Sequence, residues 1–361
     1  MKNSSSLRLL ASLGITGILV FLFQNFTELK IQATDYRYSV FHLKNLSELG
    51  AQSMAYGVTA EGEAMGHSLG DDGLWHSVIW SPDGTPRDLG VRPEFDFSKR
   101  RPANAIAQPY SAKGVWITSF PKSLWINKKE CRESCNIEDL ARHYELGHRV
   151  TAKKLDSYLI SMGEIKNLGH IRGSSRTFSV GVNNNRQIVG WYFDDSTQLS
   201  QGFLWEKGKL KSLGAPKDGF SEAHDINDLG QIVGMAYSPK LGQRPVIWSQ
   251  VGDDFKAMDL FASLDKRGME GEAYSINNQG DVIGEAQIQG QKKPFIWNVK
   301  DGLRDLNKLT EESDPLSEKQ KWTLESARGI NRCGRIVGWG KSSEGTGQAY
   351  MLKPLQPLPG C

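Results

Sequence analysis

The sequence predicts an all-β protein, a β-propeller of about six four-stranded blades. Three observations predict this fold: a short motif recurs along most of the chain, its pieces are of strand length with alternating apolar and polar residues, and glycine is abundant, at 38 of 361 residues. Glycine-rich turns between short strands account for that abundance. The formal net charge of +3 is small and evenly spread, so we expect no nucleic-acid partner.

The N-terminal segment is the first element along the chain. Lys2 and Arg8 precede an uncharged stretch that runs from Leu9 to Thr27. This pattern is typical of an export signal, and its length is also near the ~20 residues that span a bilayer. We predict a signal peptide or membrane anchor over residues 1–33 and one propeller domain over 34–361. The propeller is therefore expected outside the cytoplasm, in the periplasm, anchored to the inner membrane on that side, or secreted.

The first half of the repeat is a strand, a turn and a second strand. The segments AHDINDLGQIVG, AYSINNQGDVIG and ARGINRCGRIVG are near-copies, and looser copies precede them. The copies begin at Ala55, Ala103, Ser179, Ala223, Ala273 and Ala327. Asparagine and the first glycine suit the turn because both tolerate a positive φ, and the second glycine allows close approach of a neighbouring backbone.

The second half of the repeat supplies the third and fourth strands. The third ends in two apolar residues and usually tryptophan, and a segment of the Asp-Leu-Gly type closes the unit. One such sheet cannot bury both its faces, so the copies must pack face to face, with the tryptophans supplying apolar surface. The repeat residues to which we assign this structural role are Asn183, Asn227, Asn277, Asn331, Trp80, Trp205, Trp248 and Trp297.

The two ends of the repeat array predict how the ring closes. The last copy ends without a fourth strand, whereas a lone strand of that type begins at Tyr38. If the N-terminal strand completes the last blade, the numbers of first and fourth strands are equal. Such a shared blade also removes open sheet edges.

These motifs resemble the HAF repeats of bacterial extracellular proteins, in which alanine, Ile-Asn, Gly-Gln-Ile-Val-Gly, Ala-Phe-Leu-Trp and Asp-Leu-Gly follow in order. The resemblance is clear at Asn227, Asn277 and Asn331, and it is poor where Thr59 and Ala107 replace the asparagine. It implies an exported repeat protein with a propeller fold, and it implies no reaction.

The spacing between Ala107 and Asn183 is longer than between other copies, so an insertion or a degenerate seventh blade must fill it. We favour an insertion over about 127–161. Asn136 is suited to begin a short helix there and Gly147 to end it.

The four cysteines are Cys131, Cys135, Cys333 and Cys361. In an exported protein an even count predicts disulfides, of which a local 131–135 bond and a 333–361 bond are the pairing we favour among three. Cys131 and Cys135 with His143 and His148 also have residue types that bind zinc, but their spacing fits no standard finger. We expect the disulfide instead.

Two further motifs suggest chemistry that we do not expect. Ser68 lies in GHSLG, which matches the nucleophile elbow of α/β-hydrolases, but no helix follows it, as that elbow requires. Asp225, Asn227 and Asp228 in DINDLG suggest calcium, yet Leu229 takes the place of a ligand, and turn capping explains these residues. We therefore predict no catalytic residue, cofactor or metal.

Three functional hypotheses follow. The first is a monomeric envelope or surface protein that binds a protein or glycan partner and contacts membrane only through its N-terminal segment. The second is an exported hydrolase or lyase, which two or more carboxylates or histidines converging at the ring axis would favour. The third is a structural spacer without a ligand. A ligand site is expected where the copies differ, in loops or in the 127–161 insertion.

Overall fold

The computed structural model describes residues 38–47, 52–91, 107–110, 115–118, 149–151, 154–161, 164–169, 173–174, 176–262, 269–288, 290–310, 322–341, 347–356 and 361. They belong to one compact unit, 37–361. Across these ranges the chain forms twenty-five strands and one short 3-10 helix, η1 (Leu306–Lys308). Within the same ranges no helix has the length and apolar character needed to cross a membrane.

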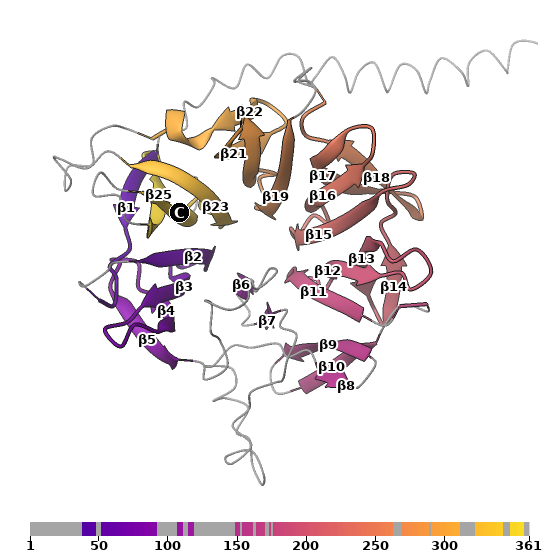
Figure 1. Cartoon of the computed structure of the whole chain (residues 1–361), viewed down its shortest axis with the longest axis horizontal. Helices are drawn as coiled ribbons and strands as arrows, with labels where there is room; N and C mark the ends of the chain where they lie inside the picture. Colours follow the sequence, from indigo (N-terminus) through magenta and orange to yellow (C-terminus); the bar gives the residue numbers. More distant parts are fainter. Residues whose placement is uncertain are drawn as a thin grey trace, which may run out of the picture. The chain divides into compact units, whose positions relative to one another are not determined.

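Four blades are continuous in sequence, and each contains four antiparallel strands that follow in chain order; three of them are separate four-stranded sheets, and the fourth, β11–β14, is part of a larger sheet. The β2–β5 blade comprises Ser53–Val58, Ala64–Leu69, Trp75–Trp80 and Pro86–Val91; the β11–β14 blade comprises Arg176–Val182, Ile188–Phe193, Ser200–Glu206 and Lys209–Ser212. The β15–β18 blade comprises Phe220–Ile226, Ile232–Ser238, Gly242–Val251 and Asp254–Asp259; the β19–β22 blade comprises Glu270–Ile276, Val282–Ile288, Gln291–Asn298 and Gly302–Asp305. Figure 1 shows these blades arranged as a propeller, with the first strand of each innermost.

The fifth blade joins the two ends of the unit, and we call it the shared blade. It contains β23 (Thr323–Ile330), β24 (Ile336–Lys341), β25 (Gly347–Pro354) and, as its outer strand, β1 (Tyr38–His42). Tyr38 pairs antiparallel with the residue at the end of β25, so β1 supplies the missing fourth strand (Figure 1). The N-terminal strand therefore completes the last blade, as predicted.

The predicted number of six four-stranded blades is wrong, because the described residues form five. Between β5 and β11 the described residues form β6 (Ala107–Tyr110), β7 (Val115–Thr118), β8 (Arg149–Thr151), β9 (Lys154–Ser161) and β10 (Glu164–Gly169). Strand β9 pairs with β7, β8, β10 and β11, so these strands extend the sheet of the β11–β14 blade and form no separate blade within the described part of the chain. In this part of the chain the repeat motif is eroded, and Ala107 replaces the turn asparagine.

Residues 149–151 and 154–161, in the C-terminal part of the insertion expected over about 127–161, are strands β8 and β9 of that extended sheet. The helix predicted between Asn136 and Gly147 lies outside the described residues, as do Cys131 and Cys135.

The repeated asparagine shapes the first turn of each blade and also joins it to the next blade. In Asn227, Oδ1 accepts the main-chain N–H groups of Leu229 and Gln231 at 3.1 and 2.9 Å, which closes the turn. Gly230 follows in that turn with φ +76°, a conformation that glycine adopts without strain. The amide Nδ2 of Asn227 points the other way and donates to the main-chain oxygen of Asn277 in the neighbouring blade at 3.0 Å.

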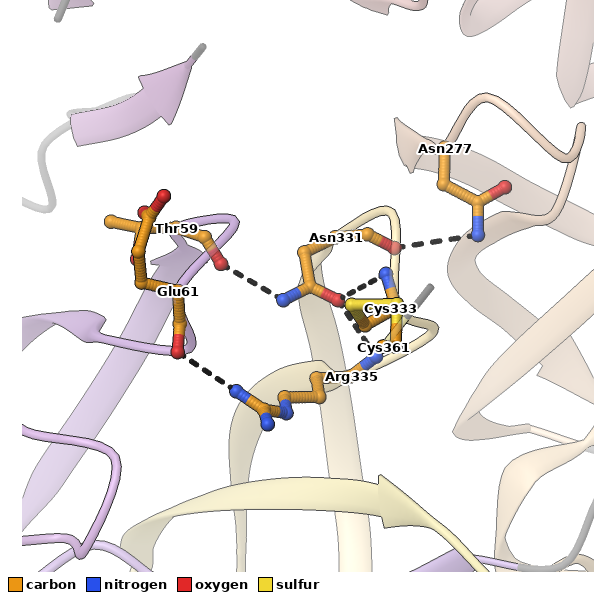
Figure 2. The surroundings of a disulfide bond; sticks show 7 residues. All are labelled: Thr59, Glu61, Asn277, Asn331, Cys333, Arg335 and Cys361. Atoms are coloured by element: carbon orange, nitrogen blue, oxygen red, sulfur yellow. Dashed lines mark hydrogen bonds between the residues drawn. A yellow bond between two sulfur atoms is a disulfide. The ribbon is translucent and has the colours of Figure 1, made fainter. Parts of the chain in front are cut away.

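The same amide-to-carbonyl bond recurs around the propeller, and we call the series the asparagine ladder. Asn183 donates to Asn227, Asn277 to Asn331, and Asn331 to Thr59, at 2.9, 3.4 and 2.8 Å. Figure 2 shows Asn331 between the turns of its two neighbours. Thr59 has no amide, and its hydroxyl accepts the N–H of Glu63 at 3.1 Å, so the ladder ends before the irregular strands β6 and β7.

Every regular blade has a β-bulge in its innermost strand, one residue after the alanine of the motif. The bulged residues are Tyr56, Val180, His224, Tyr274 and Arg328. The second motif glycine lies opposite, in the second strand. A Cβ on Gly234 would lie 2.0 Å from the main-chain oxygen of Glu222, and the equivalent glycines have the same close approach, so no side chain fits there.

The core lies between blades. Trp248 is 1% exposed and packs in one cluster with Val189 and Leu204 of the preceding blade. Trp80 packs with Val337 and Met351 of the shared blade, and its indole N–H donates to the main-chain oxygen of Lys44 at 2.7 Å. Trp205 is buried, and Trp297 packs partly buried against the cluster of the β19–β22 blade. The tryptophans therefore fill the faces between neighbouring sheets.

A disulfide joins Cys333, in the turn between β23 and β24, to Cys361 (Figure 2). It is one of the two bonds in the pairing that the spacing favoured. Arg335 in the same turn donates to the main-chain oxygen of Glu61 at 3.0 Å. The disulfide thus holds the C-terminal segment against a turn that also contacts the β2–β5 blade.

Candidate functional site: an arc of aromatic and cationic side chains

Ser68 is not placed as a nucleophile. It is the penultimate residue of strand β3, it is completely buried, and its Oγ accepts the main-chain N–H of Leu46 at 3.0 Å. His76 is opposite Ser68 on β4, but its two ring nitrogens contact the carboxylates of Asp72 and Asp88 at 2.9 to 3.2 Å. The GHSLG motif is therefore an ordinary strand of the repeat.

The residues that suggested calcium do not converge on one point. Asp225 accepts hydrogen bonds from Ser275 Oγ and from the main-chain N–H of Ile276, at 2.7 and 3.0 Å. Asn227 closes its turn, and Asp228 accepts the side-chain amide of Asn184 at 2.8 Å. Over the described residues no group of three or more His, Cys, Asp or Glu is arranged for a metal ion. The candidate zinc ligands Cys131, Cys135, His143 and His148 lie outside those residues.

The bulged position carries side chains that differ between blades: tyrosine, valine, histidine, tyrosine and arginine. The residue before it is alanine in four blades and serine in one, whereas the residue after it also varies. Four of these side chains and one tryptophan of β24 form a continuous run across the inner strands of neighbouring blades. We call this run the arc; its members are His224, Tyr274, Arg328, Trp339 and Tyr56.

The members of the arc contact one another in sequence. The rings of His224 and Tyr274 are stacked, with centroids 5.9 Å apart and planes at 23°. The guanidinium carbon of Arg328 lies 3.7 Å from the centroid of the Tyr274 ring and 4.9 Å from that of Trp339. Tyr56 contacts Trp339 edge to face at 5.6 Å. These distances are within the range of aromatic and cation–π attraction, so each side chain orients the next.

Three carboxylates lie against the arc and neutralise its cations. Glu285 accepts from Arg328 Nη2 at 3.1 Å and from the hydroxyl of Ser326. Glu272 lies 3.3 Å from Nε2 of His224, whereas Glu222 lies 3.9 Å from the same nitrogen. The hydroxyl of Tyr274 donates to Glu272 at 3.2 Å. Charge-assisted bonds of this kind fix the side chains more firmly than neutral ones do.

The environment of His224 favours its charged form. Burial lowers the pKa of this imidazole, but Glu272, Glu222 and the main-chain oxygen of Ala273 together outweigh burial, and the pKa is raised above its ordinary value. Ala273 accepts from Nδ1 at 2.9 Å, so Nδ1 carries a proton, and Nε2 faces Glu272. The adjacent Asp225 is buried as well, and burial raises its pKa to about 6 against the lowering effect of its hydrogen bonds to Ser275 and Ile276.

Part of this site is accessible to solvent. The side chain of Arg328 is 15% exposed, and those of Glu222 and Glu272 are 16% and 20% exposed. Among the described residues Nε and Nη2 of Arg328 are bonded, to Ser326 and Glu285, while Nη1 makes no hydrogen bond. The site therefore keeps one guanidinium edge and parts of two carboxylates available.

The sequence contains a signal for this site. A ligand site was expected in loops or in the insertion, whereas the arc lies on strands. The signal is the pair of residues between Ala and Ile in Ala-x-x-Ile-Asn, which vary from copy to copy while the flanking residues recur. Strict alternation along a strand does not reveal where these residues point, because the bulge shifts the register at that point.

Comparison with known proteins identifies the fold alone. No family model and no curated protein matches the chain, so membership of the HAF-repeat family is not supported. Solved structures that resemble it include a candidate TolB from Agrobacterium tumefaciens (TM-score 0.47, 11% identity, 90% of this chain and 99% of that one). A gluconolactonase from Xanthomonas campestris has a TM-score of 0.46 and 9% identity, over 90% of this chain and 92% of that one. A fucose-recognising six-bladed lectin from Aleuria aurantia has a TM-score of 0.39 and 8% identity, over 88% of this chain and 100% of that one. The sheets described above make the chain a β-propeller protein, and these likenesses do not identify its activity.

Proposed function

We propose that this protein is an exported binding module whose ligand, a protein or a glycan of the cell envelope, contacts the arc. The observation that carries the proposal is the contrast between repeated and varied positions. Asparagine, glycine and tryptophan recur in the blades because they build them. The bulged position varies, and it holds Tyr56 and Arg328, which are partly exposed, together with His224 and Tyr274, which are buried. Aromatic and guanidinium groups are the side chains that most often dominate recognition.

Export is part of the same proposal. It is supported by the basic and then apolar pattern of residues 1–33 and by the disulfide between Cys333 and Cys361, since disulfides persist mainly in oxidising compartments. Whether the first segment is cleaved is tested by N-terminal sequencing of the native protein. Membership of the HAF-repeat family stays a prediction from the motifs.

The test uses the full-length protein and two variants of the arc, Arg328→Ala and Trp339→Ala. Tyr237→Ala is the matched control, because Tyr237 is also a partly buried aromatic residue stacked on a neighbour, Phe220, and lies outside the arc. We expect wild type and control to retain the same envelope component in cross-linking and pull-down, and the arc variants to lose it. Retention by both folded arc variants would exclude the arc as the contact surface.

A second candidate function is an exported hydrolase or lyase. One observation favours it: Glu222 and Glu272 both approach His224, which is the convergence of carboxylates and histidine that an acid–base pair requires. Turnover of p-nitrophenyl glycosides or esters by wild type, abolished by Glu272→Gln and kept by Tyr237→Ala, would establish it. Absence of turnover with either class, together with ligand binding, favours the binding module.

A further inference from the structure

We propose that the ligand of the arc is an uncharged saccharide, which stacks on Trp339 and Tyr56 and forms hydrogen bonds with Arg328 and Glu272. This inference rests on the proposed function and names its ligand class. It follows from the charge balance of the site, from the hydrogen-bonding groups that remain available, and from the small area that they expose.

The charge balance disfavours a charged ligand. Arg328 and the exposed Lys292 are paired with Glu285. His224 is paired with Glu272, with Glu222 close by, so three carboxylates face three cations. An anionic group approaching Arg328 would therefore also approach Glu285, and repulsion would offset the attraction. A cationic group approaching Glu272 would also approach His224, and repulsion would offset the attraction there. Only an uncharged ligand avoids both costs.

The groups that remain free match a sugar. Nη1 of Arg328 is a donor without a partner among the described residues, and the partly exposed carboxylates are acceptors. Adjacent hydroxyl groups of a pyranose both donate and accept, so they can bond to a guanidinium and a carboxylate at once. The guanidinium is held between Tyr274 and Trp339, and this fixed orientation reduces the entropy lost on binding.

The size of the site also favours a small ligand. Its polar members are only 7% to 20% exposed, whereas a stable protein interface buries on the order of 1,000 Å² or more. Trp339 and Tyr56 are partly buried and lie edge to face, so they present a limited apolar surface of the kind that lines small-molecule sites. One or two sugar rings fit this description better than a protein surface does.

The experiment is calorimetric titration of the full-length protein with three sets of oligosaccharides of equal length. The sets are neutral (glucose, galactose, fucose and N-acetylglucosamine units), acidic (galacturonate units) and basic (glucosamine units). We expect binding to at least one neutral oligosaccharide, a loss of at least tenfold in affinity for Arg328→Lys and for Trp339→Ala, and no change for Tyr237→Ala. Arg328→Lys keeps the charge and removes the planar donor edge, so it separates geometry from charge.

Each outcome decides the question, provided that circular dichroism and thermal unfolding show the variants to be folded. Tighter binding of the acidic or basic set, or neutral binding that neither variant weakens, would overturn the inference. If no saccharide binds while an arc-dependent protein partner is cross-linked, the ligand class is wrong and the binding module stands. If neither a saccharide nor a partner is found, both proposals fail.

Discussion

The side-chain amide of Asn227 joins two blades, because it donates to the main-chain oxygen of Asn277 at 3.0 Å while its carbonyl oxygen closes the turn in which it lies. One side chain thus sets the shape of a turn and the position of the next blade. Asparagine is the shortest side chain that carries a donor and an acceptor on separate atoms, so it can bond in two directions at once. The ladder explains why the repeat keeps this residue type.

Asn227→Asp should separate the two roles. Aspartate keeps the acceptor that closes the turn, but it loses the donor and turns a negative charge toward the carbonyl of Asn277. We expect a loss of about 2–3 kcal/mol in the free energy of unfolding, measured by chemical denaturation. Gln279→Ala, an exposed change in the neighbouring turn, is the control and should stay within about 0.5 kcal/mol. An equally small effect for Asn227→Asp would contradict the structural role of the ladder.

Gly234→Ala should prevent the first two strands of its blade from approaching normally. The added Cβ would lie 2.0 Å from the main-chain oxygen of Glu222, and backbone atoms cannot move aside cheaply. We expect a loss of about 3 kcal/mol or more, or insoluble protein, measured by denaturation and soluble yield. Gly347→Ala is the matched control, because nothing lies within 4 Å of its Cβ position. Equal stability of the two variants would show that β15 shifts freely.

Removal of the disulfide should destabilise the shared blade. The bond closes a loop of sequence separation 28, for which the chain-entropy model gives about 3–4 kcal/mol. Cys361→Ser removes the bond at its exposed end without disturbing the buried turn at Cys333. We expect a lower melting temperature for the variant in oxidising buffer, and a smaller shift on addition of reductant than in wild type. An unchanged melting temperature would show that the C-terminal segment adds nothing to closure.

The interface between β15 and β19 should lose stability as the pH rises. The pKa of Asp225 is raised to about 6, so its contribution is present below its ordinary value of 3.8 and is lost as the pH rises through 6. The pKa of His224 is also raised in the folded protein. Its contribution to stability is therefore present below its ordinary pKa of 6.5 and is lost once the pH rises above the raised pKa. Glu222, Glu272, Tyr274 and, through the tyrosine ring, Arg328 surround this histidine.

The measurement is the free energy of unfolding between pH 5.5 and 8 for wild type, Asp225→Asn and His224→Gln. We expect wild type to lose stability over this range, by about 1 kcal/mol from Asp225 alone, and each variant to show a shallower slope. Gln279→Ala is an exposed change that removes no titratable group, so its slope should equal that of wild type. A wild-type stability that rises with pH in this range would contradict the assignment.

The sequence predicted the propeller fold because each part of the repeat has a local physical role. Asn and Gly define turns, alternation defines strands, and the unmatched strand at Tyr38 predicts the shared blade that β1 and β25 form. The blade count was wrong because the copy beginning at Ala103 lacks the asparagine, and pattern alone does not show whether such a segment forms its own sheet. Strand β9 instead pairs with β11 of the next blade.

The contacts within the arc could not be predicted from the sequence, for a different reason. The types of residue at the bulged positions are readable from the sequence, but their contacts depend on how neighbouring blades pack. Arg328 lies on β23, whereas the ring that it covers belongs to Tyr274 on β19 and the carboxylate that it binds belongs to Glu285 on β20. Only the packed ring brings these three residues together.

The shared blade also determines when folding can be completed. Ser39 on β1 bonds to the main-chain oxygen of Lys353, 314 positions later in the chain. During synthesis or export from the N-terminus, β1 must wait unpaired until nearly the whole chain has emerged, while the blades between the ends assemble from local contacts. The ring therefore closes last. A chain that is interrupted or truncated before β25 leaves β1 and β24 as open strand edges, which promote aggregation and proteolysis.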